Sequence, residues 1–217
     1  MIVPSSFFDR EPLELAQALI GLVLRHRVDH AEYGPVWLSA RVIETEAYFK
    51  KEKGSHSSLG FTEKRKAMFM APGTIYMYYA RGGDSFNFSA RGDGNGVLIK
   101  SGLAFTDHRS PPGTLKVMQQ LNPVNGRTRP LSKLCSGQTL ICRSLGLKVP
   151  EWNQQQLKPG QLILDDVGCK PEKLVQTKRL GIPPGRDDHL PYRFIELAHV
   201  KSSTRNPLKG EYKIIIP

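Results

Sequence analysis

The segment GPVWLSARVIETEAY, residues 34–48, constrains the fold most, because it has the pattern of a strand that ends in two carboxylates. Side chains alternate between the faces of a strand, so Val42 and the apolar residues before it share a face with Glu44, Glu46 and Tyr48. Charges on an inward face are costly unless they are paired, neutralised or opened to a site. We therefore expect a sheet protein in which this strand carries two glutamates into the interior.

Two structural explanations compete with a functional one for these carboxylates. In the first, the strand ends near Val42 and a bulge turns its tail outward, so that both glutamates are solvated. In the second, a glutamate is buried in an ion pair with Arg41 or Arg65. In the third, a buried carboxyl with a perturbed pKa performs acid or base chemistry. A Glu-x-Glu pattern alone does not decide among the three.

The rest of the chain mixes extended segments with a few short helical ones. The expected strands are residues 22–30, 34–48, three within 73–102, 160–166, 175–182 and 191–197, and the expected helices are residues 11–21, 113–122 and 136–147. The last helix opens on Ser136, an N-cap candidate, and closes at Gly146. Because strict strand–helix alternation is absent, we expect an α+β fold with one domain over residues 1–217 and a curved, mainly antiparallel sheet flanked by short helices.

Positive charge is the next informative feature. The chain has 31 Lys and Arg against 20 Asp and Glu, a net charge of +11, and basic residues cluster in KKEK, EKRK and GRTR. Such an excess is typical of proteins that bind polyanions, nucleic acid above all. The polar residues 49–67 contain glycine and lack a hydrophobic period, so we expect a long functional loop there. A basic protein without a polyanion partner is the alternative.

Several classes of protein are excluded by what the sequence lacks. Its three cysteines are odd in number and form no C-x-x-C pattern, which argues against a disulfide framework and a thiolate zinc site. Only His26 and His30 stand four residues apart, and four residues of strand span roughly 13 Å, so we expect no metal and no cofactor. The apolar runs are too short for a spanning helix and the N-terminus lacks a signal peptide pattern, which predicts a soluble, intracellular protein.

Aromatic residues surround the two glutamates in the sequence. Tyr48 follows Glu46 by two residues, His56 lies in the next loop, and IYMYYAR adds three tyrosines beside an arginine. A carboxylate, stacking aromatics and basic loops are what an enzyme that removes a base from DNA would need. Tyrosines in a strand are, however, more often packing residues than platforms for bases.

At these residues the chain resembles the alkyladenine (3-methyladenine) DNA glycosylase family. FFDREPLELAQALIGLVL is similar to the opening helix of the family, ARVIETEAY to its active-site strand and KRKAMFMAPGTIYMYYARG to its central block. Later landmarks are GDGNGVLIK, LCSGQTLICRSLGL and RLGI followed by LPYRF. The resemblance covers most of the chain. It implies a monofunctional enzyme that flips alkylated or deaminated purines (3-methyladenine, hypoxanthine, ethenoadenine) out of duplex DNA and hydrolyses the N-glycosidic bond, leaving an abasic site.

The resemblance also implies catalytic roles for matching residues. Glu46 matches the general base that activates water, and such a carboxylate also stabilises positive charge that develops on the sugar. Lys100 takes the place of an arginine near that water, where we expect a spectator cation rather than a Schiff-base nucleophile. Glu44 matches a neighbouring acid with a supporting role.

The same resemblance implies a pocket for the extruded base. Tyr48, His56 and Tyr78 match aromatic walls that stack on the base, and the backbone N–H of His56 is expected to donate to its six-position. Asn87 matches a residue that obstructs the exocyclic amine of guanine.

Two stretches depart from the family. Arg81 stands where the family inserts a tyrosine wedge into the gap left by the flipped nucleotide, and Tyr79 is the alternative wedge. The basic loop also differs in composition. Our candidates for contacts with DNA phosphates are Thr62, Lys64, Arg65 and Lys66. A solvated basic loop is the alternative.

The leading hypothesis is therefore a base-excision enzyme whose partner is double-stranded DNA with damaged purines, with no membrane partner. We expect a monomer in the cytoplasm or nucleoid of a bacterium. A catalytically silent nucleic-acid-binding module with the same fold is the main alternative. A sugar hydrolase that uses Glu44 and Glu46 as an acid and base pair is disfavoured, because binding of a neutral glycan would not need the excess of positive charge.

Overall fold

Nine strands form one sheet in the computed structural model, which describes residues 1–80 and 82–217. The strands are β1 (Val23–His30), β2 (Gly34–Tyr48), β3 (Ile75–Ala80), β4 (Gly83–Ser89), β5 (Gly96–Ala104), β6 (Leu162–Asp165), β7 (Leu174–Thr177), β8 (Arg193–Glu196) and β9 (Tyr212–Ile215). Arg81, the residue predicted to act as the wedge, lies outside the described residues.

The helices are short. The α-helices are α1 (Pro12–Ala18), α2 (Thr114–Leu121), α3 (Gln138–Leu145) and α4 (Val149–Trp152). The 3-10 helices are η1 (Ser5–Phe8), η2 (His56–Leu59), η3 (Glu63–Phe69), η4 (Leu131–Lys133), η5 (Leu197–Ser202) and η6 (Pro207–Lys209). None of the described helices is long and apolar enough to cross a membrane.

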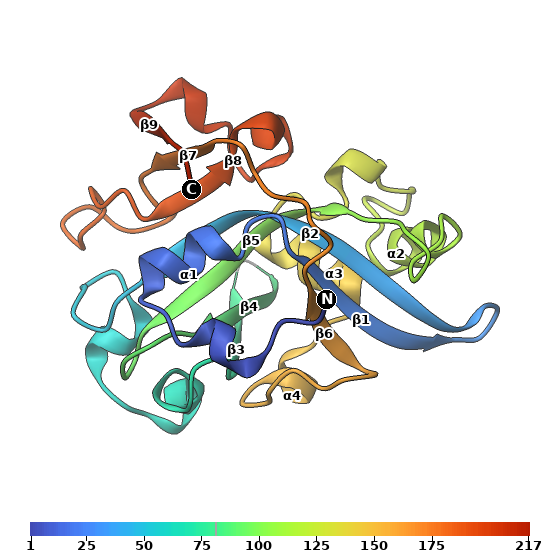
Figure 1. Ribbon diagram of the computed structural model, residues 1–217, viewed down its shortest axis with the longest axis horizontal. Coiled ribbons are helices and arrows are strands. Elements are labelled where there is room, and N and C mark those ends of the chain that lie inside the picture. Colours follow the sequence, from blue (N-terminus) through green and yellow to red (C-terminus); the bar gives the residue numbers. More distant parts are fainter. Residues whose placement is uncertain (81) are drawn as a thin grey trace.

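The sheet is antiparallel throughout its strand pairs and follows the order β3-β4-β5-β2-β8-β7-β9, while β1 pairs with β2 and with β6. Figure 1 shows the long β1–β2 hairpin crossing the molecule, with β7, β8 and β9 gathered at one end. The prediction of an α+β fold with a mainly antiparallel sheet and short helices is confirmed.

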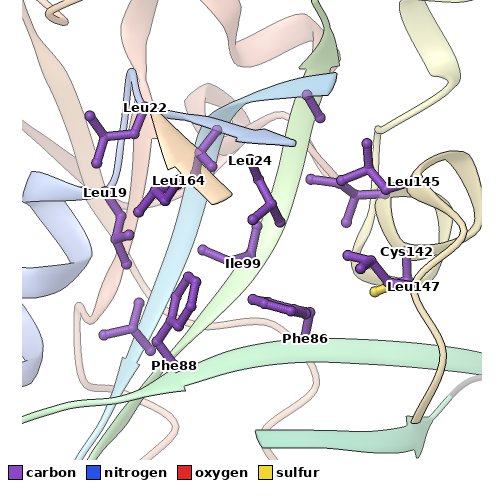
Figure 2. Close-up of a cluster of buried hydrophobic side chains, with 14 of the residues drawn as sticks. Leu19, Leu22, Leu24, Phe86, Phe88, Ile99, Cys142, Leu145, Leu147 and Leu164 are labelled. Carbon is purple, nitrogen blue, oxygen red and sulfur yellow. The ribbon is translucent and has the colours of Figure 1, made fainter. Parts of the chain in front are cut away.

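The main hydrophobic core lies on one face of the sheet. Figure 2 shows Leu19, at the end of α1, on one side of this core and Cys142 and Leu145 of α3 on the other. Between them lie Phe86 and Phe88 of β4 and other strand residues, including Leu24, Ile99 and Leu164. Burial of such side chains stabilises the fold by about 1.5 to 3 kcal/mol each.

Alternation along four neighbouring strands leaves the opposite face to polar and aromatic residues. Ile75, Met77, Phe86, Phe88, Val97, Ile99 and Ala47 belong to the main core. The residues between them are Tyr76 and Tyr78 on β3, Ser85 and Asn87 on β4, Leu98 and Lys100 on β5, and Glu46 and Tyr48 on β2. The sheet itself therefore brings these eight side chains to one face.

The face predicted for the two glutamates of β2 is wrong. Leu38, Ala40 and Val42 belong to the main core, but Glu44 and Glu46 lie on the opposite face, because the pairing of β2 with β5 is irregular between Val42 and Thr45. Such a bulge reverses which side chains face the core. The bulge near Val42 that the first alternative predicted is present, but its prediction of solvated glutamates is wrong, since both carboxylates are 0% exposed.

Most of the predicted elements are present, with differences at their ends. Gly146 closes α3 in the left-handed conformation at φ 66°, as predicted. The predicted N-cap is wrong, because Gly137 occupies that position and no side chain caps the helix. The strand expected over residues 175–182 is Leu174–Thr177, and the chain then leaves the sheet. Residues 49–67 lack strands, but η2 and the start of η3 lie within them.

Candidate active site

A cavity of about 380 Å³ opens on the polar face of the sheet. It is lined by five of the residues predicted to form the site, which are Tyr48, His56, Tyr78, Asn87 and Lys100. The strands β2 to β5 provide its floor, η2 and η3 provide one wall, and residues 180–183, which follow β7, provide another. Its volume lies within the range of about 300 to 1,000 Å³ common for small-molecule sites.

Glu46 lies directly behind this lining, and each of its contacts is a group that faces the cavity. Its Oε2 accepts hydrogen bonds from the Tyr48 hydroxyl at 2.8 Å and from Lys100 Nζ at 3.2 Å. Its Oε1 accepts one from the Leu180 backbone N–H at 2.9 Å. Tyr48, Lys100 and Leu180 all line the cavity. All three donors of the carboxylate therefore belong to residues of the cavity lining.

These donors keep Glu46 ionised. Burial on its own would raise the pKa of the carboxyl, but the Lys100 ammonium, the Leu180 N–H and the Tyr48 hydroxyl outweigh burial, so the pKa of Glu46 is lowered. A buried anion beside an open cavity can take a proton from a bound molecule or stabilise a positive charge that develops there.

Glu44 is buried in a different environment. Its Oε1 accepts from Arg193 Nε at 2.6 Å, and its Oε2 accepts from Ser101 Oγ at 2.5 Å and from the Thr204 N–H and hydroxyl at 2.8 Å and 3.0 Å. The alternative of a buried glutamate–arginine pair is therefore correct for Glu44, but the partner is Arg193 rather than Arg41 or Arg65. Arg41 pairs instead with Glu196 at 2.9 Å.

The aromatic wall of the cavity is a packed group of His56, Tyr76 and Tyr78. The ring centroids of His56 and Tyr78 lie 4.5 Å apart, and those of Tyr76 and Tyr78 lie 5.4 Å apart in a stacked arrangement. His56 Nδ1 and the Tyr76 hydroxyl lie within hydrogen-bond distance, at 3.1 Å. Burial and the charge of Arg65 lower the pKa of His56, so the imidazole is neutral at pH 7. Burial raises the pKa of Tyr76 to about 12, so its hydroxyl stays protonated.

Comparison with known proteins agrees with this geometry. Residues 6–199 match the family model of methylpurine-DNA glycosylase. The chain belongs to this family. It is accordingly a DNA glycosylase, a hydrolase that acts on N-glycosyl bonds in DNA, and not a sugar hydrolase.

Relatives across most of the chain carry related names. A Pseudomonas aeruginosa protein named "Putative 3-methyladenine DNA glycosylase" is 57% identical over 208 residues, which cover 95% of this chain and 85% of that protein. A protein of the same name from Pseudomonas savastanoi pv. phaseolicola is 55% identical, with 95% and 91% covered. One from Methanoculleus marisnigri is 30% identical over 201 residues, with 89% and 94% covered.

Three of the four residues predicted to contact DNA phosphates lie next to the cavity. Thr62, Lys64 and Arg65 line a second hollow that shares His56, Tyr76 and Tyr78 with the cavity. Lys66 pairs with Glu63 at 3.7 Å. Tyr79, the alternative wedge, is 67% exposed and lies in a separate hollow beside Arg143 and Lys148. The contacts of these residues with DNA stay predictions.

Sequence reasoning missed several residues of the site. Gln138, the first residue of α3, accepts from Lys100 Nζ at 3.0 Å and donates to Ser85 Oγ at 2.8 Å. Arg179 is buried with its Cζ 4.5 Å from the Tyr48 ring centroid, and it pairs with Glu52. Both come from distant parts of the chain, and no local pattern in the sequence marks them as neighbours of β2.

No group of three His, Cys, Asp or Glu side chains within residues 1–80 and 82–217 is placed to hold a metal ion. Glu46 Oε2 accepts two hydrogen bonds and Oε1 accepts one. The groups described at the cavity include this carboxylate, a lysine, an imidazole and phenols.

Proposed function

We propose that this glycosylase removes alkylated or deaminated purines, with 3-methyladenine, hypoxanthine and ethenoadenine as candidate bases, from duplex DNA. The damaged nucleotide rotates into the cavity, and water activated by Glu46 displaces the base, which leaves an abasic site. The relatives named as 3-methyladenine DNA glycosylases support the choice of base.

The observation that carries the proposal is the position of Glu46, which is 0% exposed and held ionised behind the cavity lining. A carboxylate oxygen can accept two hydrogen bonds, and Oε1 accepts one, from Leu180. A second position on Oε1 can take the nucleophilic water. As the bond to the base breaks, the sugar gains positive charge, which the same anion stabilises.

The aromatic wall supports base flipping. A base stacked on an aromatic side chain gains about 1 to 3 kcal/mol, which offsets part of the cost of unstacking it from the duplex. Tyr48, His56 and Tyr78 face one cavity and so can stack on one base. Asn87, whose Nδ2 donates to the Tyr76 carbonyl at 2.9 Å, is fixed on the floor, where it would meet an exocyclic amine of guanine.

The surroundings of Lys100 support a monofunctional reaction. Schiff-base chemistry and strand cleavage need a free amine, whereas Lys100 Nζ donates to Glu46 and to Gln138 and is 3% exposed as a residue. We assign it the role of a cation that keeps Glu46 ionised.

Duplex DNA is the expected macromolecular partner, bound by a monomer. The net charge of +11 and the basic residues of η3 at the mouth of the cavity supply the electrostatic attraction. Binding should weaken by roughly a thousandfold between low and moderate salt, if several phosphates are neutralised.

A duplex with a single hypoxanthine tests the proposal. The protein is incubated with it in EDTA, and abasic sites are revealed by heating in alkali. With the wild type, the strand should break only after alkali. The excision rate of Glu46→Gln should be lower by a factor of about 10² to 10⁴, the usual contribution of a general base. Strand breaks without alkali would refute the monofunctional assignment. Full activity in Glu46→Gln would refute the role of Glu46.

A further inference from the structure

The charges around the base cavity are unbalanced. Its lining includes the basic side chains of Arg65, Lys100 and Arg186 and no Asp or Glu. Lys100 is compensated, because its ammonium pairs with Glu46 at 3.2 Å. Arg186 donates a hydrogen bond to the Lys53 carbonyl. Because its side chain is exposed, solvent screens its charge. Arg65 is the remaining cation.

Arg65 belongs to η3 and lies between two hollows. It lines the base cavity and also the second hollow, and His56, Tyr76 and Tyr78 face both. The side chain is half-buried and its Nη1 donates to the Gly60 carbonyl at 3.3 Å. Glu63, the acid closest to it in the sequence, pairs with Lys66 instead. The charge of Arg65 is therefore not neutralised by a neighbouring carboxylate of η3.

The field of Arg65 reaches the aromatic wall. Together with burial, which is the larger cause, its charge lowers the pKa of His56, and it acts against burial on the pKa of Tyr76. A base that stacks on this wall would lie in the same field. A purine alkylated at a ring nitrogen carries a positive charge while it is attached to the sugar, whereas hypoxanthine is neutral and has an oxygen acceptor.

We propose that Arg65 is a specificity-determining residue, whose charge disfavours cationic alkylpurines relative to neutral purines in the cavity. This inference rests on the proposed function and deepens it by naming the class of lesion that the pocket favours. It also differs from the contact with DNA phosphates predicted for Arg65 from the sequence. A phosphate contact lowers the affinity for every duplex alike when it is removed, but a charge beside the base changes the ratio between substrates.

The test compares two duplexes with wild type and Arg65 variants. One duplex carries hypoxanthine, and the other carries freshly formed 3-methyladenine, a cation in the nucleotide. Single-turnover rates are measured for both after subtraction of the enzyme-free release. The ratio of the two rates, taken relative to wild type, removes the different intrinsic reactivities of the two bases.

Arg65→Gln and Arg65→Met should raise the ratio of 3-methyladenine to hypoxanthine excision by roughly tenfold, since a unit charge across a partly screened pocket has an effect of that order. Arg65→Lys keeps the charge and should keep the wild-type ratio. Lys66→Gln, a matched loss of one positive charge on the same helix, should lower both rates by a similar factor.

Each other outcome has a distinct meaning. An equal loss of both rates in Arg65→Gln, with a shallower dependence on salt, would show a phosphate contact only and overturn the inference. An increased ratio in Arg65→Lys as well would show that shape rather than charge discriminates, and would also overturn it. Wild-type protein that releases neither base would refute the proposed function itself, and the inference with it.

Discussion

Glu44 and Glu46 lie two residues apart on one strand and are both fully buried, yet their surroundings differ. Glu44 accepts hydrogen bonds from Arg193, Ser101 and Thr204, none of which lines the base cavity. Glu46 accepts from Tyr48, Lys100 and Leu180, all of which do. Burial and charge are therefore the same for the two carboxylates, and what separates them is the position of their donors.

This difference indicates a division of roles. A carboxylate whose four hydrogen bonds come from a packed C-terminal segment and β5 ties those elements to β2, and its contribution is to stability. A carboxylate whose donors form the wall of a cavity can exchange a hydrogen bond with a molecule bound there. This division would be wrong if Glu44 were needed for excision or if Glu46 contributed only to stability.

The largest effect on the Glu44 side is expected from Glu44→Gln. Removal of one partner leaves the Arg193 guanidinium buried without its counter-charge, and such a loss costs about 3 to 5 kcal/mol in free energy of unfolding. Urea denaturation measures this cost. The single-turnover excision rate, measured well below the unfolding midpoint, should stay close to wild type.

Glu46→Gln is the matched variant, because it makes the same chemical change two residues away. It should lose excision whatever its effect on stability. If Glu44→Gln, still folded, lost excision as fully as Glu46→Gln, the division of roles between the two glutamates would be wrong.

The next effect concerns the cation beside Glu46. Burial raises the pKa of Glu46 and Lys100 is the main group that lowers it, so Lys100→Met should raise this pKa. In wild type the Glu46 carboxyl is ionised at and above the ordinary carboxyl pKa of 4.5, so the fall of the excision rate in acid, the acidic limb of its pH profile, lies below that pH. In Lys100→Met this limb should move to higher pH. A pH profile of single-turnover rates measures the shift.

The same change alters the effect of pH on stability. In wild type, Glu46 contributes stability above its unfolded pKa that is lost as pH falls through its folded pKa. A Lys100→Met variant whose folded pKa exceeds the unfolded one should instead lose stability as pH rises through that folded pKa. Lys64→Met removes the same charge at the mouth of the cavity and should leave the acidic limb in place. An unmoved limb in Lys100→Met would contradict the role of Lys100.

The fold was largely predictable from local pattern. The alternation in β1 and β2, the turns around β4 and the glycine that ends α3 each depend on a few adjacent residues, and the structure contains them. The bulge after Val42 was one of the alternatives that the sequence left open, but the sequence could not decide for it, because the bulge depends on the pairing of β2 with β5 across the sheet. Strand β9 was missed as well, although its sequence, YKII, contains a tyrosine and two isoleucines, which favour strands.

The site was predictable in part, and chiefly through resemblance. The residues of β2, β3, β4 and β5 fall in recognisable blocks, and the cavity brings Tyr48, His56, Tyr78, Asn87 and Lys100 together. Two donors of Glu44, Arg193 and Thr204, and the backbone N–H of Leu180 could not be predicted, because they reach β2 through long-range folding of the last forty residues. The partner predicted for a buried glutamate was wrong for the same reason.

The smallest effects are expected when a single hydroxyl donor is removed from either glutamate. Tyr48→Phe keeps the ring and removes the hydrogen bond of 2.8 Å to Glu46, while Thr204→Val removes the hydroxyl 3.0 Å from Glu44 and keeps the Thr204 backbone N–H. A hydrogen bond to a charged group contributes about 1.5 to 3 kcal/mol.

Tyr48→Phe should therefore slow excision by roughly tenfold or more, because the donor that holds Glu46 in place is lost. Thr204→Val should lower the free energy of unfolding by about 1.5 kcal/mol, the low end of this range, and leave the excision rate unchanged, because backbone and Ser101 donors remain on Glu44. Both quantities are measured in both variants, and a slower excision in Thr204→Val with unchanged stability would place Glu44 in the chemistry after all.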